Sequence, residues 1–171
     1  MPTEPMTADD LARRLRLHRH LEGGWYSETY RAELVLPAHA LPSAYAGPRA
    51  AATSILFLLA RGDVSRLHRL RSDELWYYHA GDPLVVHVLT PDGAYFRAVL
   101  GPDPAADQLF QVAVTAGCWY GAEPAGAWSL VGCAVAPGFD YLDFELALRD
   151  DLVAQYPDQR EVIERLTRGA V

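Results

Sequence analysis

Between about residues 25 and 145, short runs of apolar and aromatic residues alternate with turn-forming residues. The runs are rich in Val, Leu, Phe, Tyr and Trp, which favour β-strands, whereas the Gly, Pro and Asp between them favour turns. The breaks fall at residues 37–48, 61–63, 80–83, 91–93, 101–107, 123–126 and 137–138. Several short strands at this spacing predict an all-β sandwich or barrel and argue against a parallel α/β sheet.

The two ends of the chain carry helical patterns instead. Near the N-terminus, Thr7 precedes Asp9 and Asp10, and leucines follow. A Thr hydroxyl at this place accepts an unpaired backbone N–H, and the two carboxylates complement the positive end of the helix dipole, which is typical of a helix start. We therefore expect short helices at about 8–17 and 157–167.

Length, composition and charge limit the number of domains and the kinds of partner that we expect. No repeat or linker divides the chain, so we expect one domain over residues 1–171, with a strand core at about 22–146. Half of the residues are apolar and 22% are charged, as in ordinary globular proteins. The formal net charge of -7 disfavours nucleic acid or an anionic membrane as the main partner, because neither would be neutralised.

The chain also carries no obvious targeting segment. It has no apolar run of about 18 residues, and its polar N-terminus lacks the apolar core of a signal peptide, so a cytoplasmic location is expected. Cys118 and Cys133 are too few for a disulfide framework. We expect both to be reduced thiols in strand-like segments.

One stretch carries a recognisable spacing. Gly62, His68, Glu74 and Gly81 follow the pattern G-x5-H-x5-E-x6-G. This resembles the first signature of the cupin superfamily, G-x5-H-x-H-x3,4-E-x6-G. In metal-binding cupins the two histidines and the glutamate are ligands, but Leu70 stands here in place of the second histidine.

A later stretch is similar to the second cupin signature, G-x5-P-x-G-x2-H-x3-N. Gly117 falls at the turn glycine of that signature, Thr115 replaces its proline, and Tyr120 replaces its histidine. Of the four metal ligands that the resemblance implies, only His68 and Glu74 remain in place.

More of the chain resembles a narrower group, the DUF985 or Cupin_5 family. The segments that carry this resemblance are HLEGGWYSETY at 20–30, TSILFLL at 53–59, SDELWYY at 72–78 and SLVGCAVAPGFD at 129–140. The resemblance runs from about Leu11 to Leu166. It implies an RmlC-like cupin barrel, also called a double-stranded β-helix or jelly roll, with a short helix at each end. Cupins of this type commonly pair through an N-terminal strand, so a homodimer is expected.

The candidate site follows from strand alternation and this resemblance together. Alternation puts Glu74, Trp76 and Tyr78 on one face of a strand, and the cupin match turns that face toward the barrel interior. Buried polar groups need partners, so such a face favours the wall of a cavity over pure core. The expected cavity residues are His68, Glu74, Tyr120, Trp76, Tyr78, Gln111, Trp119 and, outside the signatures, Glu22. His18, His20, His39 and His87 match no motif and are expected at surface or strand positions.

Three functions fit this cavity. The favoured one is metal-independent acid–base chemistry of epimerase or isomerase type on a small polar molecule, similar in fold and residue type to the deoxysugar 3,5-epimerases. In it, His68 is the base, Glu74 orients it, and Tyr120 is the acid on the opposite side of the barrel. Trp76, Tyr78, Gln111 and Trp119 would be walls.

The second function is a mononuclear metal-dependent dioxygenase or isomerase. A divalent metal ion would then be held by His68 and Glu74, but these matched positions offer fewer protein ligands than the three of a typical catalytic site. The third function is non-catalytic binding of a small ligand between aromatic side chains. The sequence therefore leaves two possibilities for the cofactor: none, or a divalent metal ion.

Overall fold

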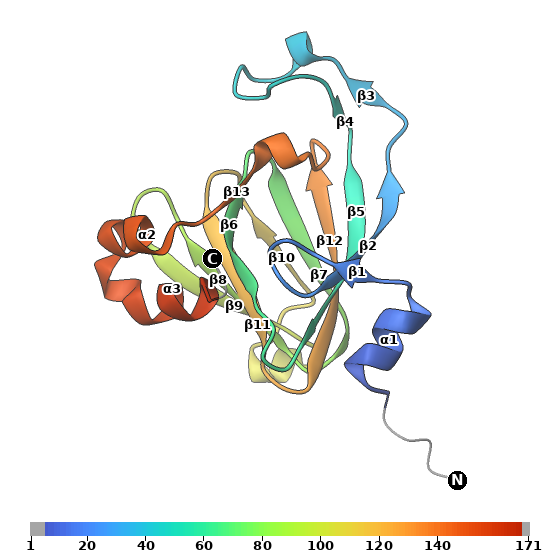
Figure 1. Cartoon of the computed structure of the whole chain (residues 1–171), viewed down its shortest axis with the longest axis vertical. Helices are drawn as coiled ribbons and strands as arrows, with labels where there is room; N and C mark the ends of the chain where they lie inside the picture. The colour runs from blue at the N-terminus through green and yellow to red at the C-terminus, as the bar shows by residue number, and fades with distance from the viewer. Residues whose placement is uncertain (1–5, 169–171) are drawn as a thin grey trace.

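The computed structural model describes residues 6–168, which form a barrel of two antiparallel sheets with short helices on the outside (Figure 1). The first sheet has the order β1 (His18–Arg19), β2 (Trp25–Arg31), β5 (Thr53–Ala60), β12 (Trp128–Ala136), β7 (Asp73–Gly81) and β10 (Gln111–Val114). The second has the order β13 (Phe144–Leu146), β6 (Ser65–Leu70), β11 (Trp119–Pro124), β8 (Leu84–Leu89) and β9 (Tyr95–Leu100). Apart from the pairs β1–β2 and β8–β9, neighbouring strands of these two sheets are not consecutive in sequence. The predicted all-β cupin barrel is confirmed.

Helix α1 (Ala8–Arg14) begins where the sequence predicts. The Thr7 hydroxyl accepts the Asp10 backbone N–H at 3.2 Å, and the Asp10 carboxylate accepts the Thr7 N–H at 3.3 Å. This reciprocal capping satisfies two donors that the first helical turn would leave unpaired. The helix packs on the outer face of the first sheet, against Leu58 and Leu130.

The C-terminal part forms two short helices where the sequence predicts one. Helices α2 (Arg149–Gln155) and α3 (Arg160–Leu166) are separated by a 3-10 turn at Pro157–Gln159, because proline breaks a continuing helix. Both cover the outer face of the second sheet, on which Leu67 and Trp119 are buried.

The main core fills the space between the two sheets. Phe57, Trp76, Val86 and Val131 are among its fully buried members, each contributed by a different strand. Both cysteines are free and buried, as the sequence predicts. Within residues 6–168, none of the helices is long and apolar enough to cross a membrane.

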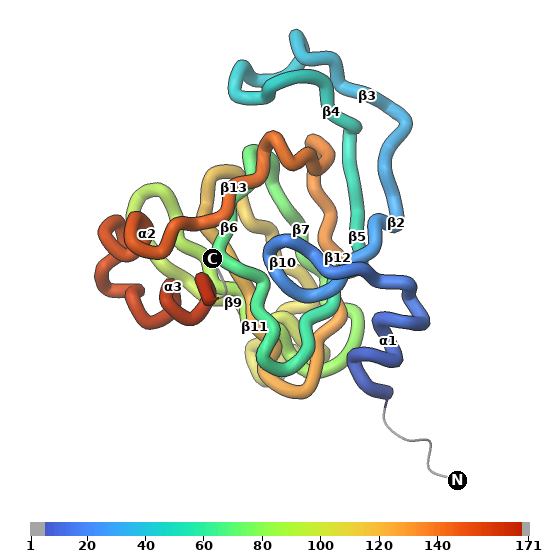
Figure 2. Tube along the Cα trace, in the orientation of Figure 1, coloured from blue at the N-terminus to red at the C-terminus, as the bar shows by residue number. Residues whose placement is uncertain are grey.

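An arm made of β3 (Val35–Leu36), the 3-10 turn Ala38–Ala40 and β4 (Arg49–Ala50) stands away from the barrel body (Figure 2). Its base is tied to the barrel by a buried ion pair, in which the Arg49 guanidinium contacts both oxygens of Asp143 at 2.7 and 2.9 Å. Asp143 lies in the 3-10 turn Tyr141–Asp143, which borders the cavity described next.

Candidate functional site

A cavity of about 220 Å³ lies inside the barrel. Its deep part is formed by buried side chains, and its outer part by exposed or half-buried ones that mark the mouth. The lining residues are His20, Glu22, Tyr26, Glu28, Arg31, Thr53, Ile55, His68, Leu70, Glu74, Cys133, Val135, Phe139, Asp140 and Tyr141.

His68 is placed in the cavity by the alternation of β6. Leu67 faces the C-terminal helices, so His68 faces inward and is only 2% exposed. Its Nδ1 lies 2.7 Å from the carbonyl oxygen of Arg66, which can only accept, so Nδ1 carries a proton. In the neutral ring Nε2 is then unprotonated. Burial lowers the pKa of His68 below its usual value, which keeps the imidazole neutral near pH 7.

Glu22 is the carboxyl group nearest to this free nitrogen. Its Oε2 lies 3.4 Å from His68 Nε2, while Ser65 Oγ donates to its Oε1 at 2.8 Å. The loop between β1 and β2 brings Glu22 here because the Arg66 N–H donates to the Glu22 carbonyl at 2.8 Å. Burial raises the pKa of Glu22.

His20 completes the contacts of Glu22, although the sequence assigns it no role. Its Nδ1 accepts the backbone N–H of Glu22 at 3.2 Å and lies 3.5 Å from Glu22 Oε2. Two unprotonated ring nitrogens, of His20 and His68, therefore face one carboxyl oxygen. Three acceptors in contact repel one another unless they share a proton. A proton that His68 Nε2 takes from a bound molecule relieves this repulsion, because it lies against the Glu22 carboxyl group.

Glu74 enters the cavity from β7 and is buried. Its Oε2 accepts the indole N–H of Trp76 at 3.0 Å. Burial raises the pKa of Glu74 to about 7, the nearby His68 lowers it, and the nearby Glu22 raises it again. A carboxyl group with a pKa in this range can both donate and accept a proton near neutral pH.

Tyr120 lies beside His68, and its expected place across the barrel is wrong. Strands β6 and β11 are direct neighbours, with Tyr120 opposite His68 in the register and their ring centroids 4.3 Å apart. Burial and the nearby Glu74 raise its pKa well above the usual value for tyrosine, so the phenol is neutral. Among the described residues, its buried hydroxyl has no hydrogen-bond partner.

Two predicted wall residues lie behind or outside the cavity. Trp76 is buried in the core and supports Glu74 through its indole N–H. Trp119 faces the opposite way from Tyr120, because adjacent residues of a strand alternate. It packs under α2 and α3, with the Arg69 guanidinium 4.5 Å from its ring.

Gln111 and Tyr78 also do not line the cavity. Gln111 is exposed on β10 and lies opposite Tyr77, so its side chain is on the outer face of the sheet; the inward positions of β10 are Val112 and Val114. The face expected for Gln111 is therefore wrong. The Tyr78 hydroxyl donates to the Gly81 carbonyl at 2.6 Å, away from the cavity residues.

The mouth of the cavity carries groups that no sequence motif indicates. Tyr26, Phe139 and Tyr141 provide aromatic rings, with the rings of Phe139 and Tyr141 in edge contact at 5.0 Å. Arg31 at the mouth is held by two hydrogen bonds to Glu28, at 2.7 and 3.0 Å. The only available signal is that Tyr26, Glu28, His20 and Glu22 share the segment HLEGGWYSETY.

The cupin resemblance implies a metal, but the donor atoms of this cavity are arranged otherwise. Within residues 6–168, no group of three or more His, Cys, Asp or Glu side chains is placed to hold a metal ion. The donors are engaged instead: His20 Nδ1 with a backbone N–H, Glu22 Oε1 with Ser65, and Glu74 Oε2 with Trp76. We therefore derive no step through a metal.

Two solved structures are similar over nearly the whole chain. The protein SO0799 from Shewanella oneidensis is 41% identical, with a TM-score of 0.86, over 96% of this chain and 99% of that chain. A hypothetical protein from Leishmania major is 36% identical, with a TM-score of 0.85, over 94% of this chain and 98% of that chain.

A more distant match concerns the fold alone. Oxalate decarboxylase from Bacillus subtilis is 15% identical, with a TM-score of 0.53, over 88% of this chain and 37% of that chain. No curated protein matches the chain. A family model described as Cupin superfamily (DUF985) matches residues 9–147. The chain therefore belongs to the Cupin_5 (DUF985) family of the cupin superfamily.

Proposed function

We propose that the barrel binds a small, uncharged hydroxycarbonyl compound and moves a proton at the carbon next to its carbonyl group, as an isomerase or epimerase does. One observation carries this proposal: a buried imidazole with a lowered pKa and a buried carboxyl with a pKa of about 7 share one cavity. The lowered pKa of His68 and the raised pKa of Glu74 let His68 be the neutral base while Glu74 still carries its proton as the acid.

The proposed step is balanced within the cavity. His68 Nε2 takes the proton, the C–H bond breaks, and its electron pair forms the carbon–carbon double bond of an enol. Glu74 donates its proton to the carbonyl oxygen, so that no free enolate builds up in the buried site. Glu22 then faces the imidazolium at 3.4 Å and stabilises it. His68 then returns its proton to the former carbonyl carbon, while the hydroxyl group on the carbon that lost the proton gives its own proton to Glu74. The carbonyl group is thereby moved by one carbon, and both side chains regain their starting protonation.

The position of Tyr120 favours isomerisation over two-base epimerisation. An epimerase of the two-base kind needs its acid and its base on opposite faces of the substrate. Here the phenol lies beside His68, on the neighbouring strand. A single base that removes and returns the proton on one face fits a shift of the carbonyl group along the substrate.

The charges of the cavity support an uncharged substrate. Four carboxyl groups line it, and Arg31 is already paired with one of them. A carboxylate or phosphate inside the cavity would meet these groups without a free cation, which costs free energy in a buried place. The hydroxyl groups of a neutral sugar-like molecule can instead donate to carboxyl oxygens, and its C–H faces can pack on the aromatic rings of the mouth.

The test is uptake of deuterium from D2O by a panel of neutral hydroxyaldehydes and hydroxyketones, followed by NMR or mass spectrometry. The wild type should label at least one compound at the carbon next to the carbonyl, and His68→Gln should abolish the labelling. His39→Gln is the matched control, because His39 is exposed in the arm. Labelling that survives His68→Gln at the wild-type rate would contradict the proposal.

We also propose that two copies pair along β2. Strand β1 covers only the Trp25 and Tyr26 end of β2, so the remaining edge has no strand partner among the described residues. Exposed apolar side chains, of Tyr30, Leu34 and Val35, follow along this edge and into the arm. Light scattering at micromolar protein should give twice the one-chain mass of 18.9 kDa, and the mass of a single chain would contradict the pairing.

A further inference from the structure

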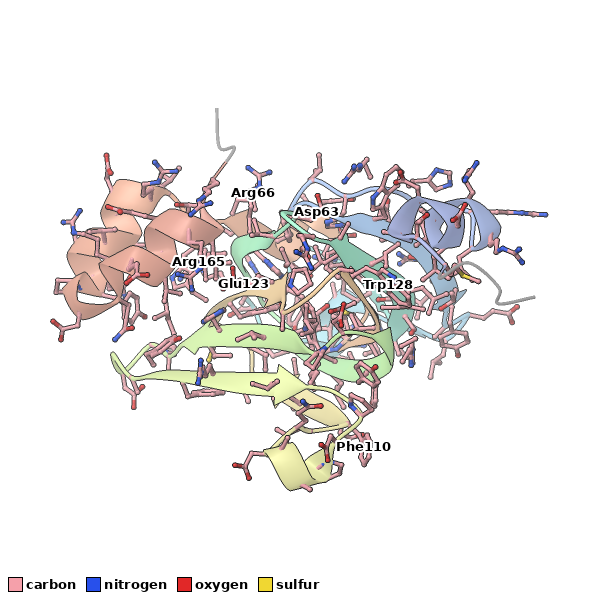
Figure 3. All side chains as sticks on the ribbon, turned by 90° about the horizontal axis from the view of Figure 1, so that it is seen from below. Asp63, Arg66, Phe110, Glu123, Trp128 and Arg165 are labelled. Atoms are coloured by element: carbon pink, nitrogen blue, oxygen red, sulfur yellow. The ribbon has the colours of Figure 1, made fainter. Side chains whose placement is uncertain are left out.

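A second hollow lies on the other side of the loop that carries Glu22. This arginine groove, of about 450 Å³, is lined by four arginine residues: Arg19 of β1, Arg66 of β6, Arg165 of α3, and Arg168 in the turn after α3. Arg66 and Arg165 lie between the C-terminal helices and the N-terminal helix in Figure 3. Four cations that converge in this way are notable in a chain with a net charge of -7.

The groove keeps an excess of positive charge after its carboxylates are counted. Asp63 lies 3.4 Å from Arg19, and Glu123 accepts from Arg165 at 2.9 and 3.1 Å. The third acidic residue of the lining, Glu22, is buried, and its carboxyl group contacts Ser65 and His68 on the side of the barrel cavity. Four guanidinium groups therefore face two half-buried carboxylates, those of Asp63 and Glu123.

The guanidinium groups are partly held in place. Arg19 lies over the ring of Trp25, 3.9 Å from its centroid. Arg66 donates one Nη2 hydrogen bond to the Leu21 carbonyl, the one hydrogen bond of its guanidinium found among the described residues. A guanidinium has five N–H donors in a planar fork, so Arg66 still has donors for a ligand. Groups that are already ordered lose less conformational entropy on binding.

Glycine residues line part of the groove and leave it free of side chains. Gly23 has φ = 112°, and a Cβ there would lie 2.1 Å from the Val64 carbonyl oxygen, so no other residue fits. Gly24 and Gly62 also line the groove without a side chain. The arginine groups therefore surround an open space that a compact anion can enter.

We propose that the arginine groove binds a phosphate-type oxyanion. Planar guanidinium groups match the paired oxygens of phosphate and form charge-assisted hydrogen bonds with them. This chemistry differs from that of the barrel cavity, which is rich in carboxyl groups. The groove and the cavity share His20 and Glu22 in their walls, so an anion in the groove lies next to the acid–base cluster.

The first experiment is calorimetric titration with inorganic phosphate and with pyrophosphate at low ionic strength. Arg66→Gln combined with Arg168→Gln should weaken pyrophosphate binding at least about 10-fold, as loss of charge-assisted contacts does. The control removes the same charge elsewhere, by combining Arg69→Gln and Arg160→Gln, two exposed residues paired with Glu145 and Glu164. The control should bind as the wild type does. No saturable binding by the wild type, or equal weakening in both double variants, would overturn the site.

Two further binding experiments complete the test. The first distinguishes a free phosphate from a phosphorylated substrate, and the second tests the groove independently of the proposed function of the cavity. A hexose 6-phosphate that binds more tightly than phosphate, and loses that advantage in His68→Gln, identifies the groove as the anchor of a phosphorylated substrate. In that case only the uncharged part of the substrate enters the cavity, and the fully uncharged substrate proposed above is replaced. Equal affinities identify a site for the free anion. His68→Gln should still bind pyrophosphate, because His68 does not line the groove. Loss of pyrophosphate binding in that variant, with the fold intact by circular dichroism, would contradict a separate groove.

Discussion

Glu22 Oε2 lies 3.4 Å from His68 Nε2, although one residue is on a loop and the other is in the middle of a strand. The contact matters because the other nitrogen of His68 is fixed as a donor to the Arg66 carbonyl. A proton that reaches Nε2 is therefore placed next to Glu22. This relationship makes Glu22 the partner of the base and leaves Glu74 as a separate proton donor.

The first prediction concerns the contact between Glu22 and His68. Glu22→Gln removes the negative charge that stabilises the imidazolium, so deuterium uptake should slow by about 10- to 100-fold, in the lower range of general acid–base effects. Glu28→Gln is the control, because Glu28 lines the mouth and pairs with Arg31 instead. Equal slowing in both variants would show that Glu22 acts only through the overall charge of the cavity.

The second prediction concerns pH. The step needs neutral His68 and protonated Glu74. Deuterium uptake should fall on the acid side as His68 gains a proton, below its usual pKa, and on the alkaline side as Glu74 loses its proton, near pH 7. Glu74→Gln should remove the alkaline decline and lower the maximum rate. A profile that keeps rising above pH 8 in the wild type would speak against Glu74 as the acid.

The third prediction concerns the effect of the Glu74 carboxyl group on the free energy of unfolding. The folded-state pKa of Glu74, about 7, lies above the ordinary value of 4.5 for a glutamate, so the folded protein binds more protons and loses stability as pH rises between these values. From pH 5 to pH 8 this group should cost about 2 kcal/mol of the free energy of unfolding. The difference in stability between wild type and Glu74→Gln should therefore shift by about that amount in favour of the variant. Urea unfolding at the two pH values measures it, and a constant difference would be contrary to expectation.

The fourth prediction concerns the arm beside the cavity. Arg49 and Asp143 have side chains only 3% and 4% exposed, so Arg49→Ala leaves a buried carboxylate with only the more distant Arg71, at 3.8 Å. This should lower the free energy of unfolding by about 3 kcal/mol. Arg69→Ala breaks an ion pair of the same length, with Glu145, at an exposed place and should cost less than about 1 kcal/mol. Similar losses of stability in both variants would contradict the prediction that the buried Arg49–Asp143 pair matters more for stability than the exposed pair.

The fold was predictable because local signals agree with one another. Turn residues separate the strands, and the spacing from Gly62 to Gly81 places His68 and Glu74 on inward positions of two strands. Both do line the cavity. The helix start at Thr7 was also predictable, since capping depends on a few neighbouring residues.

The rest of the site depends on contacts between distant segments. His20 belongs to no metal signature and reaches the cavity because its loop is hydrogen-bonded to β6. The faces of Gln111 and Trp119 are set by the register of β10 and β11 against their neighbours, and a shift of one residue reverses the face. The place of Tyr120 beside His68 follows from strand order, which short-range patterns do not contain.

The most direct test is an NMR titration of the Glu74 carboxyl carbon and the His68 ring nitrogens in the substrate-free protein. We expect Glu74 to titrate at about pH 7 and His68 to titrate below the usual value of 6.5, with its proton on Nδ1. Glu74→Gln and His68→Gln assign the two signals. A Glu74 carboxyl that titrates near the ordinary value of 4.5, or a His68 that stays protonated above pH 7, would contradict the acid and base on which the proposed function rests.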